Sequence, residues 1–190
     1  AQSVRGSALG WGVLGRRQQR DTELHRSLEL PAPGGSGIEV AREELLRGAV
    51  CVLLRLSPAA HLATAEKVDL LLEPLNVRDV PGYLYATTEA AMDVITAIGE
   101  ANVKLQFDFY HVQIMEGDIG ERISTLFREI GHVQFSSVPG RYEPQYGEVN
   151  VYPLFEQLDV LGYTGWVGCE YRPLGGTREG LSWAKCYDLG

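Results

Sequence analysis

The sequence predicts an α/β fold in which short parallel strands alternate with helices. From residue 63 onward, apolar runs typical of buried strands alternate four times with stretches that have helical spacing. A polar residue follows or ends each apolar run. From one of these four polar residues to the next, the intervals are 35, 26 and 36 positions. Each interval is close to the roughly 30 residues or more of a strand–helix–strand unit. We therefore expect four parallel strands whose carboxyl ends meet on one side of a sheet.

The apolar runs set the expected strands. They are short and continuous, as expected for strands that are covered on both faces. The four expected strands are Val68–Leu72, Val103–Phe107, His132–Phe135 and Gly165–Cys169.

Residues that can start or stop a helix lie between these strands. The first helix begins at Thr87 or Thr88 and stops at Gly99. The second carries apolar residues from Ile119 to Ile130 and is closed by Gly131, whereas the third is capped by Asn150 and ends at Gly162. A last helix starts at Thr177.

The chain changes character near residue 62. Residues 1–62 have a charge balance of +2, whereas residues 63–190 have a balance of −10. Residues 1–37 show no sustained period and are expected to be irregular. Residues 38–47 can form a helix, and residues 49–56 either extend it or form a strand. We therefore divide the chain into an irregular or partly helical extension, 1–62, and a strand–helix region, 63–190.

Composition narrows the classes of function. With 190 residues, 45% hydrophobic and 22% charged, the chain is typical of a soluble globular protein. We expect a cytoplasmic protein with no membrane partner, because no run has the length of a membrane span and the start does not resemble a signal peptide. The net charge of −8 argues against a nucleic-acid surface. Three cysteines without a CxxC pair predict neither a disulfide framework nor a thiolate zinc site.

Four side chains at the expected strand ends are candidate metal ligands. Three carboxylates and an amide that converge among apolar residues repel one another unless a positive charge lies among them. Oxygen ligands favour Mg²⁺ or Mn²⁺ over zinc. The alternative is that these acids only accept hydrogen bonds from backbone groups or arginine. The candidate metal ligands are Glu73, Asp108, Gln134 and Glu170.

Two further residues are candidates for substrate binding. His111 follows Asp108 by three positions, and we expect it to contact the substrate from the same loop. Arg141 lies in a loop bounded by glycine and proline, and its planar guanidinium can pair with a substrate carboxylate. An ion pair of Arg141 with Glu143 or Glu148 is the alternative.

Several stretches carry a resemblance to a known family. LLLEPLN, FDFYHVQIMEGDI, GHVQFSSVPGRYEPQYGEVNVYPLF and GYTGWVGCEYRPLGGTREGLSW resemble the C-terminal half of hydroxypyruvate isomerases, which are TIM barrels of the xylose isomerase-like superfamily. The resemblance covers roughly residues 63–190. It implies a partial TIM barrel of four C-terminal strand–helix units, truncated relative to the eight strands of the family. Open barrel edges of this kind make self-association possible.

The resemblance also implies an activity and residue roles. It implies a small hydroxy-keto acid substrate and interconversion of hydroxypyruvate and 2-hydroxy-3-oxopropanoate (tartronate semialdehyde). Glu73 and Glu170 would act as the catalytic residues by exchanging a proton between neighbouring carbons through a metal-stabilised enediolate. Two alternatives stay open: an inactive half-barrel that binds a metal or a partner chain, and a related keto-sugar epimerase. The epimerase is less favoured because Gln134 stands where those relatives have histidine.

Overall fold

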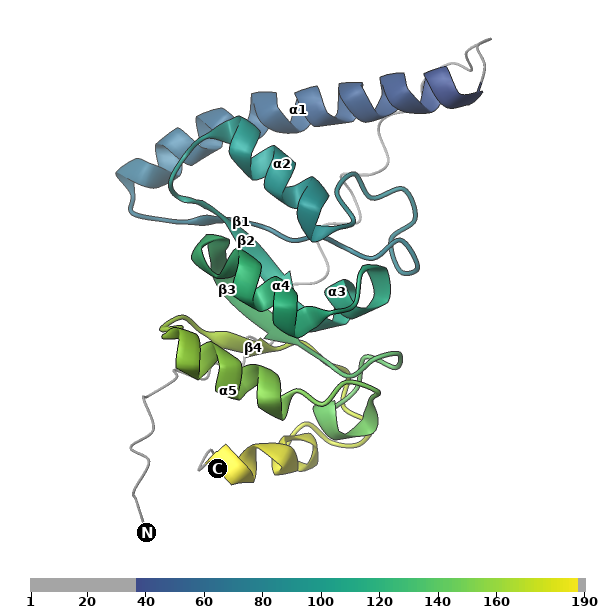
Figure 1. The fold of residues 1–190 in the computed structure, drawn as a ribbon, viewed down its shortest axis with the longest axis vertical. Coiled ribbons are helices and arrows are strands. Elements are labelled where there is room, and N and C mark those ends of the chain that lie inside the picture. The colour runs from purple at the N-terminus through teal and green to yellow at the C-terminus, as the bar shows by residue number, and fades with distance from the viewer. Residues whose placement is uncertain (1–36, 188–190) are drawn as a thin grey trace.

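A computed structural model of the chain describes residues 37–187, with side chains described for residue 48 and residues 50–185. Its centre is the predicted parallel sheet of four strands, which lie in the order β1-β2-β3-β4 (Figure 1). This arrangement is that of a partial TIM barrel, in which sequential strands lie side by side. The strands are β1 (Leu70–Leu72), β2 (Val103–Asp108), β3 (Ile130–Phe135) and β4 (Val167–Cys169).

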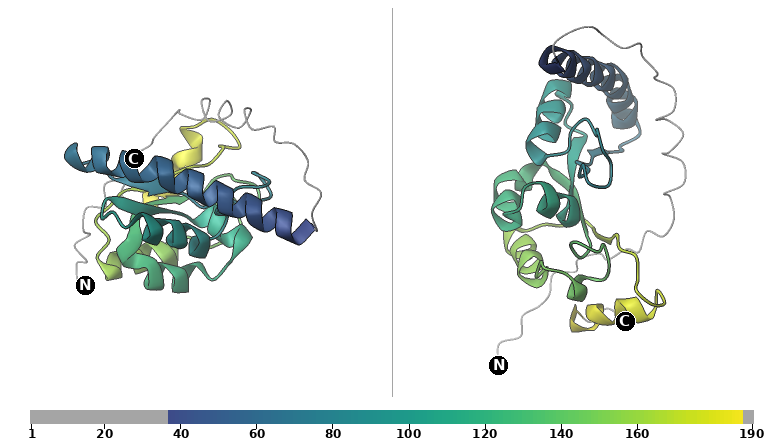
Figure 2. Two further views of the ribbon diagram at one scale, coloured as in Figure 1. Left: turned by 90° about the horizontal axis from the view of Figure 1, so that it is seen from above. Right: turned by 90° about the vertical axis from the view of Figure 1, so that its right-hand side faces the viewer.

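Helices connect the strands and cover one face of the sheet. Figure 2 shows α2, α4 and α5 stacked along the same side of the strands. The α-helices are α1 (Gly37–Ala65), α2 (Thr88–Ile98), α3 (Phe109–Met115), α4 (Ile119–Leu126) and α5 (Tyr152–Leu161). The 3-10 segments are η2 (Phe127–Glu129), η3 (Pro144–Tyr146) and η4 (Glu179–Tyr187).

The alternation of side chains along β2 separates the core from the opposite face. Val103, Leu105 and Phe107 are buried in the hydrophobic core. Lys104 and Gln106 point to the other face and are half-buried. Asp108 lies two positions after Gln106 and four after Lys104, so its side chain is on the same face as theirs. The last residue of β2 therefore places a carboxylate at the carboxyl end of the strand, on the face opposite the core.

The ends of α2 agree with the sequence prediction. The Thr87 side chain accepts a hydrogen bond from the Ala90 backbone N–H at 3.2 Å, which satisfies one free donor of the first turn. Gly99 stops the helix with a φ of 72°, a left-handed conformation that glycine adopts without a steric penalty.

Other boundaries differ from the prediction. Ile130 and Gly131 do not close the second helix; they begin β3, because η2 tightens the chain after Leu126 and leaves these residues free to pair with β2. The N-cap of α5 is Val151 and not Asn150, whose Oδ1 accepts only from the Tyr152 N–H, at 3.3 Å. The last helix is a 3-10 segment, and it begins at Glu179 instead of Thr177.

The described N-terminal part is one long helix. Residues 49–56 extend the helix over residues 38–47 and do not form a strand. The change of charge near residue 62 falls inside this helix, and Leu53 and Leu56 pack against the core. The prediction of an irregular segment over residues 1–37 lies outside the described residues except at Gly37.

In the part of the chain that the structure describes, no helix is both long enough and apolar enough to cross a membrane. The cytoplasmic location stays a prediction.

Candidate active site

The strand register brings the predicted ligands to one end of the sheet. Asp108 of β2 pairs with Gln134 of β3 in the parallel ladder. Glu73 directly follows β1, and Glu170 directly follows β4, where its backbone N–H donates to the Phe135 carbonyl at 3.1 Å. All four candidates therefore lie at the carboxyl ends of the strands, where TIM-barrel enzymes hold their active sites.

A compact group forms around Asp108. Ligand atoms of Glu73, Asp108 and His111 all lie within 4.8 Å of one another. The Nε2 atom of His111 is 3.7 Å from Asp108 Oδ2 and 3.9 Å from Glu73 Oε1, which is too far for hydrogen bonds. Asp108 is 1% exposed and His111 is 2% exposed, so solvent cannot easily satisfy them.

Three polar atoms of this group need a partner. Glu73 Oε1, Asp108 Oδ2 and His111 Nε2 are buried and have no hydrogen-bond partner among the described residues. Such atoms are costly in a folded protein unless they face a ligand, an ion or water. A divalent cation fits the two carboxylates, whose oxygens suit Mg²⁺ or Mn²⁺. The set Glu73, Asp108, Gln134 and Glu170 as its ligands stays a prediction.

The charges of the group perturb one another. Burial raises the pKa of Glu73 to about 7, and the negative charge of Glu170 adds to this effect. Burial, together with the charges of Glu73 and Glu170, raises the pKa of Asp108 well above its ordinary value. Burial and the charge of Arg141 lower the pKa of His111 to about 4. The group therefore combines two carboxyl groups of raised pKa with a histidine of lowered pKa.

Arg141 reaches into this group from the loop after β3. Its Nη2 atom is 3.0 Å from Glu170 Oε2 and 3.9 Å from Asp108 Oδ2, so the alternative of a pair with Glu143 or Glu148 is not what the structure shows. Glu143 instead accepts a hydrogen bond from the backbone of Leu174.

The backbone of the same loop fixes where Arg141 points. Its φ is 57°, in the left-handed region that is uncommon for a residue with a side chain. The Arg141 N–H donates to the Ser137 carbonyl at 2.8 Å, and the Arg141 carbonyl accepts from the Arg172 N–H at 2.8 Å. The first bond closes the loop after β3, and the second joins it to the loop after β4. The guanidinium lies over the Tyr110 ring, 4.8 Å from its centre.

Gln134 is held by a neighbour that the sequence analysis did not single out. Gln106, two residues before Asp108 on β2, donates a hydrogen bond to the Gln134 side-chain oxygen. Gly168 of β4 leaves space beside them, because a Cβ atom there would lie 3.1 Å from His132 Nε2 and 3.3 Å from Gln134 Cγ. Because side chains alternate along β2, Gln106 lies on the same face as Asp108, and this alternation is the sequence signal that could have identified Gln106.

The loop after β1 supplies two more residues that the sequence analysis missed. Asn76 and Asp79 follow Glu73 in this loop, and they contact His111 and Tyr110 respectively. No periodicity marks either residue, because both lie in an irregular segment.

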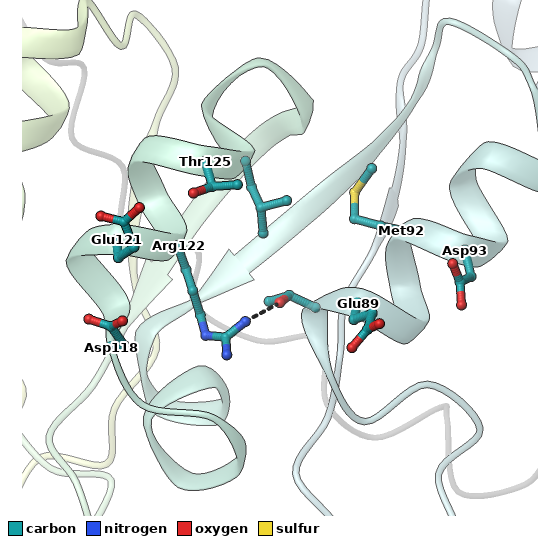
Figure 3. Close-up of a pocket in the computed structure, with 9 residues that line it drawn as sticks. Glu89, Met92, Asp93, Asp118, Glu121, Arg122 and Thr125 are labelled. Carbon is teal, nitrogen blue, oxygen red and sulfur yellow. Dashed lines mark hydrogen bonds between the residues drawn. The ribbon is translucent and has the colours of Figure 1, made fainter.

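A separate hollow lies on the helical side of the sheet. Its volume is about 460 Å³, and α2 and α4 line it with side chains that include Glu89, Asp93 and Glu121 (Figure 3). Arg122 lies in this hollow and donates to the Thr88 hydroxyl at 3.1 Å, the bond that is dashed in Figure 3. It also pairs with Glu116 at 2.8 Å. The hollow shares no lining residue with the group at the strand ends.

Comparisons with known proteins match most of this chain. The family model described as xylose isomerase-like TIM barrel matches residues 34–187. The chain is 44% identical over 152 residues to a 2-oxo-tetronate isomerase of Cupriavidus necator, a match that covers 80% of this chain and 58% of the relative. It is 40% identical over 129 residues to the hydroxypyruvate isomerase of Escherichia coli, covering 68% and 50% respectively. The chain thus spans about half the length of these two relatives.

Solved structures show the same fold. A Brucella melitensis protein described as an AP endonuclease of family 2 is 40% identical, with a TM-score of 0.71, and the match covers 73% of this chain and 54% of that one. A 3-keto-D-glucoside 4-epimerase from E. coli is 25% identical, with a TM-score of 0.68 over 83% of this chain and 59% of that one. The parallel sheet, the acidic group at its carboxyl end and these similarities lead to one conclusion: the chain belongs to the xylose isomerase-like TIM barrel family.

Proposed function

We propose that this chain carries the proton-transfer half of an isomerase that acts on a short 2-oxo acid with a hydroxyl group on the neighbouring carbon. The observation that carries the proposal is the group of half-buried Glu73 with buried Asp108 and His111, flanked by Arg141 and Glu170, at the carboxyl ends of four parallel strands. Hydroxypyruvate is the first candidate substrate, with 2-hydroxy-3-oxopropanoate (tartronate semialdehyde) as its product. Relatives named for hydroxypyruvate and for 2-oxo-tetronate support this substrate class.

The reaction moves a proton between two carbons and needs an acid and a base. A carboxylate takes the proton from the carbon that bears the hydroxyl group, and negative charge develops on the neighbouring carbonyl oxygen. A proton is then returned to the former carbonyl carbon, and the proton of the original hydroxyl group passes to the oxygen on that carbon, which gives an aldehyde and a new hydroxyl group. We assign the two proton transfers at carbon to Glu73 and Glu170. The pKa of Glu73, about 7, suits a group that must both accept and release a proton near neutral pH.

Other residues of the group bind and orient the substrate. The guanidinium of Arg141 pairs with the substrate carboxylate, a geometry that its planar fork favours. His111 directs Nε2 toward the substrate oxygen and binds it as a neutral hydrogen-bond donor. Glu73, Asp108, Gln134 and Glu170 would hold a divalent cation, Mg²⁺ or Mn²⁺. When bound, such a cation stabilises the negative charge on the substrate oxygens as a Lewis acid.

One specific observation favours another substrate. The 44% identity to a 2-oxo-tetronate isomerase makes 2-oxo-tetronate the second candidate substrate. A half-barrel that binds a metal or a partner chain without turnover is the alternative from a different class. A keto-sugar epimerase is less favoured, because Gln134 replaces the histidine that the epimerases carry.

The test is turnover by the purified 190-residue chain with Mg²⁺ or Mn²⁺. Hydroxypyruvate, 2-oxo-tetronate and a panel of keto sugars are supplied in deuterium oxide, and both product and deuterium at carbon are measured. Preferential turnover of a 2-oxo acid with label at the reacting carbon is the expected result. If the folded, metal-loaded chain gives neither product nor label, the enzyme proposal for this chain is refuted and the binding half-barrel is favoured.

A further inference from the structure

Asn76 and His111 meet through a contact that determines where the imidazole carries its proton. The backbone N–H of Asn76 donates to His111 Nδ1 at 2.9 Å. Asn76 is 0% exposed and His111 is 2% exposed, so water does not compete for this bond. A backbone N–H can only donate, and therefore Nδ1 must offer a lone pair. The neutral ring then carries its proton on Nε2.

The side chain of Asn76 reinforces the same arrangement. Its Oδ1 accepts from the Asp79 backbone N–H at 2.9 Å, which fixes the orientation of the amide group. Its Nδ2 consequently lies 2.7 Å from His111 Nδ1 and donates to Asp79 Oδ2 at 3.1 Å. Both donors of Asn76 thus face the same ring nitrogen. A protonated Nδ1 in this place would oppose two N–H groups.

Asp79 connects the loop after β1 to Arg141, the second candidate for substrate binding. Its Oδ2 accepts from the Tyr110 hydroxyl at 2.8 Å and lies 3.9 Å from Arg141 Nη1. The loop after β1 therefore supports His111 directly and Arg141 at longer range.

The proton on Nε2 separates the role of His111 from that of its acidic neighbours. Nε2 has no hydrogen-bond partner among the described residues, and it lies 3.7 Å from Asp108 and 3.9 Å from Glu73. A ring nitrogen that carries a proton has no lone pair for a cation, but it can donate a hydrogen bond to an oxygen. Within the group of three, only the two carboxylates are then available as cation ligands.

We propose that Asn76 is a positioning residue that holds His111 in the Nε2–H tautomer and thereby directs a hydrogen-bond donor at the reacting oxygen of the 2-oxo acid. The identity of that oxygen rests on the proposed function. The tautomer does not, because it follows from the contacts within the chain.

Nitrogen NMR of the full 190-residue chain, labelled with ¹⁵N in the histidine rings, tests the tautomer without substrate. His111→Gln identifies the His111 signals by their loss. Near neutral pH, the wild type should show a lone-pair signal for Nδ1 and an N–H signal for Nε2. A proton found on Nδ1 would overturn the proposal, and this measurement needs no variant of Asn76 that folds.

Two substitutions at Asn76 test the side chain. Asn76→Asp replaces the Nδ2 donor by an acceptor next to Nδ1; because charge-assisted hydrogen bonds are roughly twice as strong as neutral ones, the Nδ1 signal should change to the N–H type. Asn76→Ala keeps the backbone donor and should keep the wild-type signals. Asn150→Asp is the same change at an exposed position and should alter nothing. Wild-type signals in Asn76→Asp would overturn the role of the side chain.

Kinetics separate this proposal from the proposed function. In a chain that turns over hydroxypyruvate, Asn76→Asp should lower kcat by a factor similar to that of His111→Gln, whereas Asn150→Asp leaves kcat unchanged. An unchanged kcat in Asn76→Asp would contradict the positioning role. If the wild type shows the Nε2–H signature but no turnover of either 2-oxo acid, the proposed function fails and the tautomer assignment is still supported.

Discussion

Arg141 and Glu170 form an ion pair across the ends of β3 and β4, with 3.0 Å between Nη2 and Oε2. The pair joins the candidate carboxylate-binding group to a candidate proton donor. A substrate carboxylate that binds Arg141 must therefore share the guanidinium with Glu170. The fork geometry of arginine permits such sharing, because its five N–H donors lie in one plane.

Arg141→Lys should raise the KM for hydroxypyruvate and change kcat much less. Lysine keeps the charge but loses the planar fork, so binding weakens while the proton-transfer groups stay in place. Steady-state kinetics measure both constants. Arg172→Lys, from the loop after β4, is a matched control, and an equal rise of KM in both variants would count against the role of Arg141.

Glu73→Gln and Glu170→Gln should each abolish turnover, with losses on the order of 10² or more in kcat for removal of a general acid or base. Glutamine keeps the shape of the side chain but cannot take or return a proton. Glu66→Gln, at an exposed position, should behave as wild type. Retained kcat in either site variant would exclude that glutamate from proton transfer.

Asp108→Ala should remove the binding of Mg²⁺ or Mn²⁺. Asp108 is 1% exposed and is one of the four proposed ligands, so its loss would remove a carboxylate from the centre of the acidic group. Isothermal titration calorimetry measures the binding. Asp69→Ala removes an exposed aspartate and should bind the metal as wild type does; equal binding by both variants would refute the site.

Metal affinity should fall as the pH decreases through about 7. The pKa of Glu73 is raised to about 7, so its oxygens are free for a cation above that value and protonated below it. Titrations between about pH 6 and about pH 8 should show proton release on binding, because the cation displaces protons from the carboxylates. Affinity that is constant over this interval would mean that Glu73 is not a ligand.

Glu73→Gln should stabilise the metal-free fold at high pH. The pKa of Glu73 is about 7 in the folded chain against 4.5 ordinarily, so its ionised form is less favourable in the folded state. This penalty is complete above about pH 7, decreases as the pH falls, and is absent below about pH 4.5. Thermal unfolding in chelator should give Glu73→Gln the higher Tm at about pH 8 and little difference at about pH 5. A lower Tm of the variant at about pH 8 would contradict the prediction.

The sequence by itself determined the elements and the order of the candidate residues. The continuous apolar runs predicted all four strands, and Thr87 and Gly99 marked α2, because these signals depend only on residues that are close together in the sequence. The step of about one strand–helix unit also predicted that Glu73, Asp108, Gln134 and Glu170 end at one side of a sheet. The sequence pattern did not predict α3, which begins directly after Asp108 without an amphipathic pattern of its own.

Only the tertiary structure decided which residues meet. Arg141 pairs with Glu170 instead of the nearby Glu143 or Glu148, because the loops after β3 and β4 are joined by backbone hydrogen bonds. Asn76 reaches His111 across 35 positions of sequence, since β1 and β2 pair side by side and bring their loops together. Such contacts depend on how loops pack at the end of the sheet, and no local pattern in the chain records that packing.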